Sequence, residues 1–330
     1  MNTPAKLYQF AVLGNAVVDA IAPATEALLA AHKLIKGDSN TLSHPAMLEL
    51  AAAITIQQFR SGGSAANTAY TLGKLGARVC FVGKIGQDPT GRHFANDLVQ
   101  AGVTVTPGHA NHRTGEVFIL LTPDGLRTMA QTQPAEPSPD DSWVDEGLIE
   151  QSACLVIGAY AAGSFPAAAS FAATTAAKAG GQVVLSLASP KAVQGAATLL
   201  IDLMLSHHPL VIGNQGEWDT LLGLTDPHTA ARLEKIPRVI TRSGAGAAYY
   251  DGQGLVIDSP TQPIPRPADM TGAGDAFAAG FLHTFMGGGS PQLALQHGHQ
   301  LGRAMVLQLG PRLLTLPQLD GHGAGLPQSD

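Results

Sequence analysis

The sequence is organised around one glycine-rich stretch near its C-terminal end, Ala268-Asp269-Met270-Thr271-Gly272-Ala273-Gly274-Asp275-Ala276-Phe277. Aromatic residues recur every four positions after it, at Phe277, Phe281 and Phe285, and this spacing predicts one apolar face of a helix. We expect Thr271 to cap that helix and the glycines to leave backbone N–H groups free at its positive end. Such a helix start attracts phosphate, although a core helix capped after a glycine turn would have the same pattern.

Asp275 lies in the first turn of the predicted helix. A carboxylate is stabilised there as an ion and can accept a proton from a nearby hydroxyl. The Gly272-Ala273-Gly274 turn and this carboxylate together offer an anion cradle and a base. Phosphoryl transfer requires both, because positioning and charge stabilisation supply most of its catalysis.

Two N-terminal segments carry candidate contacts for a polyol. An apolar run from Tyr8 to Leu13, continued by Val17-Val18, is interpreted as a buried first strand with a polar exit at Asn15 and Asp19. These two side chains could hold two hydroxyls, or they could simply form a turn.

The second segment is Arg60 to Thr68, which opens a helix ending at Gly76. Its Gly62-Gly63 pair exposes backbone N–H groups, and Asn67, one turn later, can reach the same space. A tight turn that allows close helix packing is the alternative.

Three short apolar runs in the middle of the chain, Leu155 to Tyr160, Val183 to Leu187 and Leu210 to Gly213, lie about 25 to 28 residues apart. This spacing fits strand-crossover-strand units of roughly 30 residues each. The spacing predicts a parallel sheet covered by helices. Asn214 and Glu217 follow the third run at the strand end where ligands bind such sheets, and their oxygens could support Mg²⁺ through water. A capping Asn with a Glu three residues later is the alternative.

A hairpin is predicted where Glu116 to Thr122 and Arg127 to Ala130 flank Pro123-Asp124-Gly125. Two segments, about 17–60 and 107–131, are together expected to form a small β-rich lid. The whole chain, 1–330, is expected to be a single domain. Arg127 near the hairpin tip could reach an anion or could be a solvated surface charge. The segment 321–330 is expected to fray.

The Ser243-Gly244-Ala245-Gly246 turn after the predicted strand Arg238 to Thr241 could support a nucleotide phosphate. It lacks the dinucleotide pattern, because Tyr249 replaces the third glycine, and this disfavours a Rossmann dehydrogenase. A helix capped by Thr90 is predicted to run to Ala101, and a last helix is predicted from Pro291 to about Leu309.

Composition excludes several classes of protein. The 330 residues carry a net charge of −6 without a basic run, which argues against a nucleic-acid partner. Cys80 and Cys154 lie in apolar runs and predict reduced, buried thiols in a cytoplasmic protein. No leader pattern or membrane-length apolar run is present, so we expect neither targeting nor membrane association.

Taken together, the Gly-Gly motif at 62–63, Asn214-x-x-Glu217 and Thr271 to Phe277 resemble the ribokinase-like (PfkB) family of sugar and nucleoside kinases. The resemblance implies an α/β fold with three α/β/α layers, a mostly parallel central sheet and a lid. Gly14 to Asp19, Gly62 to Thr68 and the Thr122 to Met129 region look most similar to bacterial members described as adenosine kinases. Ser64 stands where ribokinases proper carry lysine.

The resemblance also implies roles. Asp275 would be the base and Gly272, Ala273 and Gly274 the anion hole. Acceptor hydroxyls would be bound by Asn15, Asp19, Gly62, Gly63 and Asn67, with Arg127 closing over the transferring phosphate. Mg²⁺ and the ATP phosphates would be organised by Asn214 and Glu217, and the nucleotide would lie along Thr241, Ser243, Gly244, Gly246, Thr271 and His299.

The implied activity is ATP-dependent phosphorylation of a ribose-type primary hydroxyl, with adenosine as the first candidate and Mg²⁺, together with a monovalent cation such as K⁺, as cofactors. A sugar kinase acting on ribose, fructose or a keto-deoxy sugar acid is the alternative, and a non-catalytic ligand sensor is a further one. Met270 and His299 depart from the family pattern, and Leu187 to Pro190 offers no aromatic residue to stack on a base. The assembly is expected to be a monomer or a homodimer.

Overall fold

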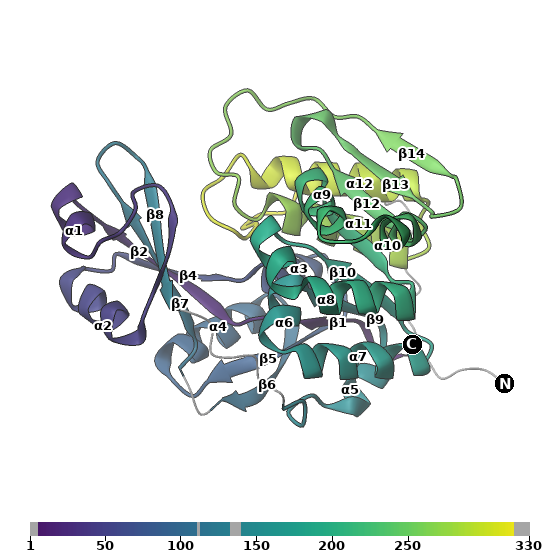
Figure 1. Cartoon of the computed structure of the whole chain (residues 1–330), viewed down its shortest axis with the longest axis horizontal. Helices are drawn as coiled ribbons and strands as arrows, with labels where there is room; N and C mark the ends of the chain where they lie inside the picture. The colour runs from purple at the N-terminus through teal and green to yellow at the C-terminus, as the bar shows by residue number, and fades with distance from the viewer. Residues whose placement is uncertain (1–5, 111–112, 133–139, 320–330) are drawn as a thin grey trace.

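The computed structural model describes residues 6–110, 113–132 and 140–319, and these form two sheets (Figure 1). The larger sheet has nine strands in the order β14-β13-β12-β11-β10-β9-β1-β5-β6. Its strands are β1 Tyr8–Leu13, β5 Val79–Gly86, β6 Val103–Ala110, β9 Ser152–Gly158, β10 Gln182–Ser186, β11 Leu210–Asn214, β12 Arg238–Thr241, β13 Ala247–Tyr250 and β14 Val256–Ser259. Neighbours from β6 to β12 are parallel, and only the β13 and β14 pairings are antiparallel.

Helices cover both faces of this sheet. Because side chains alternate along a strand, Phe10 and Val12 of β1 face one layer while Ala11 and Leu13 face the other. The first layer contains α3 Ser64–Lys74, α4 Pro89–Gln100, α11 Ala273–Met286 and α12 Pro291–Met305. The second contains α5 Glu146–Glu150, α6 Ala159–Ser164, α7 Pro166–Lys178, α8 Pro190–His207, α9 Gln215–Gly223 and α10 Pro227–Leu233. The predicted three layers and mostly parallel sheet are confirmed, and both cysteines are free and buried.

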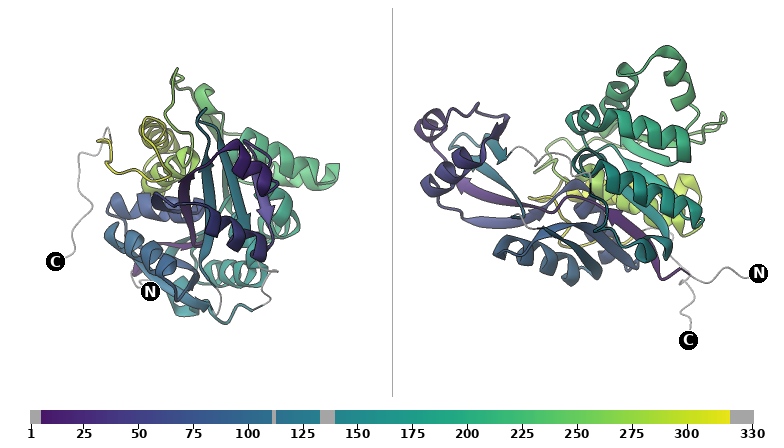
Figure 2. Two further views of the ribbon diagram at one scale, coloured as in Figure 1. Left: turned by 90° about the vertical axis from the view of Figure 1, so that its left-hand side faces the viewer. Right: turned by 60° about the horizontal axis from the view of Figure 1, so that its bottom comes forward.

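The smaller sheet projects from the main body, as Figure 2 shows. Its order is β3-β8-β7-β2-β4. The strands are β2 Val17–Pro23, β3 Ser39–Leu42, β4 Gln58–Gly62, β7 Gly115–Leu121 and β8 Arg127–Thr132. One face of it packs through Phe118 and Leu120 against α1 Glu26–Ala31 and α2 His44–Ala53. The opposite face carries Asp19 and lies toward the main body.

The structure corrects four boundaries. Val17 does not continue the first strand but begins β2 of the smaller sheet, paired with β4 and β7. Residues 107–110 belong to β6 of the larger sheet rather than to the smaller sheet. Asp88, not Thr90, caps α4, because its carboxylate accepts the Gly91 N–H and Pro89 occupies the first helical position. The last helix ends at Met305 rather than near Leu309, and the Val306 carbonyl next to it accepts the Ala268 N–H.

The segment 321–330, expected to fray, lies outside the described residues. Within the part of the chain that the structure describes, no helix is both long and apolar enough to cross a membrane.

Candidate active site

The glycine turn at the start of α11 forms one wall of the site. Its N-cap is Gly272 in the left-handed region, with φ of +78°. The prediction of Thr271 as the cap is wrong, because the Thr271 hydroxyl donates to Asp269 Oδ1 at 2.8 Å instead. A Cβ at Gly272 would lie 2.4 Å from the Pro311 carbonyl oxygen, so this position requires glycine. The hydrogen bond from the Ala276 N–H to the Gly272 carbonyl is the first of helix α11. The N–H groups of Gly274 and Asp275 come before it, so the helix does not use them and they can bind an anion.

Asp275 is held by two donors from α3. Ser64 Oγ donates to its Oδ1 at 2.6 Å, and Asn67 Nδ2 donates to its Oδ2 at 2.9 Å. Burial raises the pKa of Asp275, while these hydrogen bonds and the positive charge of Arg312 act in the opposite direction. Asn67 therefore contacts the predicted base, although the sequence predicted that it binds an acceptor hydroxyl.

Arg312 is a site residue that the sequence analysis missed. Its guanidinium is buried and donates to Asn67 Oδ1 at 3.2 Å and to the Gly62 carbonyl at 3.4 Å. The only sequence signal is a charged residue inside the otherwise apolar stretch from Pro311 to Leu314.

Asn15 and Asp19 are the residues predicted to bind the acceptor. Asn15 Nδ2 donates to Ser164 Oγ at 2.9 Å, whereas its buried Oδ1 has no protein partner. Burial raises the pKa of Asp19 to about 6, partly offset by Arg312, Arg127 and Arg60. Gly62 leaves room for this carboxylate, because a Cβ there would lie 3.1 Å from Asp19 Oδ2.

Gly63 lies next to Asn15. Its φ is +86°, and a Cβ would come within 2.7 Å of the Asn15 carbonyl oxygen. Only glycine therefore brings the turn this close to Asn15.

Arg127 connects the smaller sheet to the glycine turn. Its guanidinium makes hydrogen bonds of 3.1 to 3.2 Å to both carboxylate oxygens of Asp269. Burial alone would raise the pKa of Asp269, but the N–H groups of Thr271 and Gly310 and the Arg127 guanidinium lower it below its usual value. Arg127 thus contacts a carboxylate of the protein itself.

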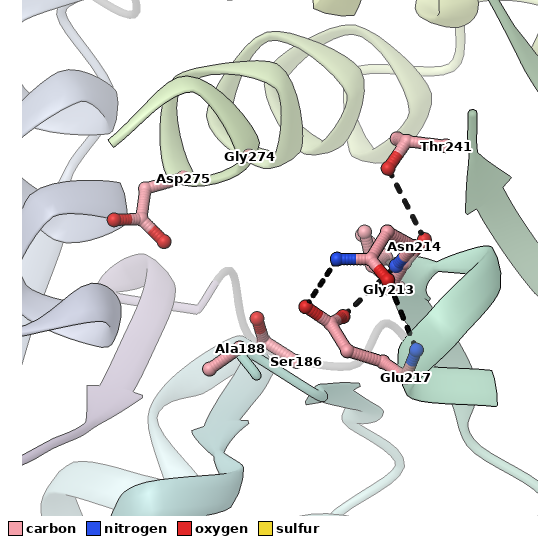
Figure 3. Close-up of a pocket in the computed structure, with 9 residues that line it drawn as sticks. Ser186, Ala188, Gly213, Asn214, Glu217, Thr241, Gly274 and Asp275 are labelled. Carbon is pink, nitrogen blue, oxygen red and sulfur yellow. Dashed lines mark hydrogen bonds between the residues drawn. The ribbon is translucent and has the colours of Figure 1, made fainter. Parts of the chain in front are cut away.

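Asn214 and Glu217 lie across a pocket of about 60 Å³ from Gly274 and Asp275 (Figure 3). The two residues form a reciprocal capping box, so the structural alternative for this motif is realised. Burial raises the pKa of Glu217 to about 7, although the hydrogen bond from the Asn214 backbone N–H acts to lower this pKa.

This donor set suits Mg²⁺ held through water. Among the described residues no three His, Cys, Asp or Glu side chains gather at one point. Mg²⁺ characteristically keeps its waters and uses one or two carboxylates with substrate phosphates, so a single Glu217 beside the pocket fits the ion.

The proposed nucleotide side lies beyond β11. Thr241 Oγ1 donates to the Gly213 carbonyl at 3.4 Å. Gly246 has φ of +101°, and a Cβ there would lie 2.2 Å from the Ser259 carbonyl oxygen. His299 Nε2 lies 3.0 Å from that same oxygen. An open hollow of about 410 Å³ adjoins this corner, lined by Pro260, Thr261, Gln262 and Arg303.

Ser243 and Gly244 complete this corner. Ser243 begins a short 3-10 turn and adopts φ of +52°, while Gly244 packs against Pro263. The structure therefore brings five of the predicted nucleotide residues to one end of the larger sheet, namely Thr241, Ser243, Gly244, Gly246 and His299.

This fold and site define a small-molecule kinase. The chain belongs to the pfkB family of carbohydrate kinases, whose family model matches residues 31–319. It is 30% identical over 259 residues to a 5-dehydro-2-deoxygluconokinase of Shouchella clausii, covering 72% of this chain and 77% of the relative. Further relatives are a ribokinase of Haemophilus influenzae, 27% identical with 77% and 83% coverage, and a fructokinase of Salmonella typhimurium, 30% identical with 70% and 78% coverage.

Solved structures share the whole fold. Adenosine kinase from Sinorhizobium meliloti is 28% identical with a TM-score of 0.78, covering 93% of this chain and 96% of that one. A probable sugar kinase from Rhizobium etli is 26% identical with a TM-score of 0.80, covering 94% and 96%. The protein is thus a carbohydrate or nucleoside kinase that uses ATP.

Proposed function

We propose that the protein transfers the γ-phosphate of ATP to the primary hydroxyl of a ribose-containing acceptor, with adenosine as the first candidate. The observation that carries the proposal is the arrangement of Asp275. Its carboxylate is oriented by Ser64 and Asn67 and follows directly on the Gly272-Ala273-Gly274 turn. A hydroxyl placed beside it can lose its proton while the turn's N–H groups stabilise the transferring charge.

The remaining residues bind and orient. Asn15 Oδ1 and the Asp19 carboxylate accept hydrogen bonds from acceptor hydroxyls, and Gly63 gives the sugar room. Asn214 and Glu217 would hold Mg²⁺ through its water, and the ion would supply positive charge against the ATP phosphates.

ATP is proposed to lie along the far end of the sheet. Its phosphates would pass Thr241, Ser243, Gly244 and Gly246, and its base would reach the hollow beside His299.

An aromatic side chain on α6 supports a nucleoside acceptor. Tyr160 is 46% exposed, and its hydroxyl lies 2.8 Å from Ser189 Oγ. It is four residues from Ser164, the partner of Asn15, so both lie on the same side of the helix. Tyr160 therefore offers a base the stacking surface that residues 187–190 lack.

A sugar kinase for a keto-deoxy sugar acid, ribose or fructose is the second candidate. Arg60 and Arg127 lie on the same face of the smaller sheet as Asp19. Arg60 is the direct partner of Asp19 across β2 and β4, and the pairing of β2 with β7 and of β7 with β8 places Arg127 on that face. These two cations favour an acceptor with a carboxylate.

The smaller sheet, built from segments within 17–62 and 115–132, is proposed to act as a lid over the acceptor. Arg127 would leave Asp269 for the transferring phosphate when substrates bind. We further propose that K⁺ activates the enzyme, which the ratio of rates in K⁺ and Na⁺ buffers would measure. We also propose that the protein is a monomer or a homodimer, which light scattering would distinguish.

The test is ADP release with ATP and Mg²⁺ over a panel of nucleosides, free sugars and sugar acids. Adenosine is expected to give the highest kcat/KM, and Tyr160→Ala should raise the KM for adenosine but not for ribose, while Tyr160→Phe keeps it. Highest turnover with a sugar acid would favour the second candidate. Binding of a metabolite without any turnover would favour a sensor.

A further inference from the structure

The buried guanidinium of Arg312 makes directional contacts on three sides. It donates through Nε to Asn67, through one terminal nitrogen to Asp97 Oδ2 at 2.5 Å, and through the other to the Gly62 carbonyl. The rings of Tyr70 and Phe94 lie 5.0 and 5.7 Å from it. Its orientation is therefore fixed from every direction.

The contact with Asn67 determines which way the Asn67 amide points. An arginine can only donate, and an ionised carboxylate can only accept. With Arg312 on Oδ1, the amide nitrogen must face Asp275 Oδ2, as observed at 2.9 Å. The reversed amide would place donor against donor at Arg312 and acceptor against acceptor at Asp275.

We propose that Arg312 is a positioning residue for phosphoryl transfer, because its guanidinium fixes the Asn67 amide that orients Asp275 and places a positive charge behind that carboxylate. The inference rests on the proposed role of Asp275 as the base. It adds a residue that contacts neither substrate and that belongs to none of the glycine motifs.

The charge environment of Asp275 supports a measurable consequence. The ionisable groups that act on it are Arg312, from the segment after α12, and Glu217, from α9. Burial raises the pKa of Asp275 and the Arg312 charge opposes that rise. Arg312 itself is faced by Asp97, Tyr70 and Asp19. Removing its charge should therefore move the acidic limb of the kcat–pH profile to higher pH.

Three substitutions separate orientation from charge. Arg312→Lys keeps the charge, Arg312→Gln keeps a donor for Asn67 without the charge, and Arg312→Met removes both. We expect Arg312→Met to lower kcat by about tenfold or more while both KM values stay within roughly threefold. The acidic limb of the kcat–pH profile should move to higher pH in both Arg312→Met and Arg312→Gln. In Arg312→Lys it should stay at the pH found for the unsubstituted enzyme.

Asp97→Asn is the matched control, because it breaks the Arg312–Asp97 ion pair but leaves the guanidinium beside Asn67. The acidic limb should not rise in this variant. A limb that stays in place in both Arg312→Met and Arg312→Gln, or that rises equally in Asp97→Asn, would overturn the inference. If Arg312→Met does not fold, the Arg312→Gln and Arg312→Lys pair gives the same decision.

Asp275→Asn separates this inference from the proposed function. If that variant keeps kcat within about tenfold of the unsubstituted enzyme, the base assignment itself fails. If it loses activity while the limb does not move with Arg312, only the role of Arg312 is refuted.

Discussion

The two ends of the proposed active site differ in how far the protein satisfies its own polar atoms. At the base end, both oxygens of Asp275 have donors and Asn67 is fixed on both sides. At the acceptor end, Asn15 Oδ1 is buried without a partner, and Asp19 keeps a raised pKa despite three arginines around it. The comparison suggests that the base end is preorganised, whereas the acceptor end is left for hydroxyl donors on a ligand.

The largest effect should come from the base itself. Asp275→Asn preserves size but removes the proton acceptor, so kcat is expected to fall by about 100-fold to 10,000-fold with little change in either KM. Steady-state ADP release checks this, with the melting temperature as a control for folding. If kcat/KM fell by the same factor but only because the acceptor KM rose, Asp275 would bind the acceptor rather than act as the base.

The next effect should come from the turn beside the base. In Gly272→Ala the new methyl group would meet the Pro311 carbonyl at 2.4 Å in a left-handed conformation. The turn must shift, and we expect kcat to fall by about 100-fold, as for loss of a transition-state donor. In Gly274→Ala the methyl group meets no atom within 4 Å, so its melting temperature should stay unchanged. Unaltered kcat in Gly272→Ala would show that this turn does not stabilise the transferring group.

Asp19→Asn should weaken acceptor binding and strengthen the fold. Losing charge-assisted hydrogen bonds is expected to raise the acceptor KM by about tenfold to 100-fold, with kcat and the ATP KM changing less. The pKa of Asp19 rises from 3.8 to about 6 on folding, so its stabilising contribution exists at low pH and is lost as the pH rises through about 6.

At pH 7 the ionised Asp19 therefore costs stability, and Asp19→Asn should raise the free energy of unfolding by up to about 3 kcal/mol. Urea unfolding at pH 7 and pH 4 measures this, and the gain should vanish at the lower pH. A variant that loses stability at pH 7 would contradict the description of Asp19 as an unsatisfied carboxylate.

The smallest effect should be a pH dependence of acceptor binding. Protonation of Asp19 near pH 6 removes a strong acceptor, so the acceptor KM should rise by about tenfold or less between pH 7 and pH 5. The ATP KM serves as the internal control, and the acceptor KM of Asp19→Asn should lose the dependence. A flat profile in the unsubstituted enzyme would remove Asp19 from the acceptor site.

Local sequence patterns predicted the elements whose limits are set locally. The strand Arg238–Thr241 has the predicted bounds, and the strand Tyr8–Leu13 covers the predicted apolar run, although its expected continuation at Val17 belongs to β2. The Asn214 and Glu217 capping box was an explicit alternative because its spacing is local. Thr271 was assigned wrongly because its hydroxyl turns to Asp269, a preference that the cap rule alone does not contain.

The contacts that build the base end could not be predicted from local patterns. Ser64 and Asp275 are 211 residues apart, and Arg312 and Asn67 are 245 apart. These pairs meet only because α3 and α11 pack side by side on one face of the sheet and the segment after α12 returns to them. The family resemblance identified the motifs. It did not identify Arg312, which lies outside them and contacts the Asn67 amide that donates to Asp275.

The most direct test of the central claim compares adenosine with 5′-deoxyadenosine, which lacks the hydroxyl to be phosphorylated. With ATP and Mg²⁺, adenosine should give ADP and a product carrying one new phosphate. The deoxy analogue should compete with adenosine, because Asn15 and Asp19 still bind its remaining hydroxyls, yet it should give no ADP above background. Equal ADP release with both compounds, or no competition by the analogue, would contradict the account.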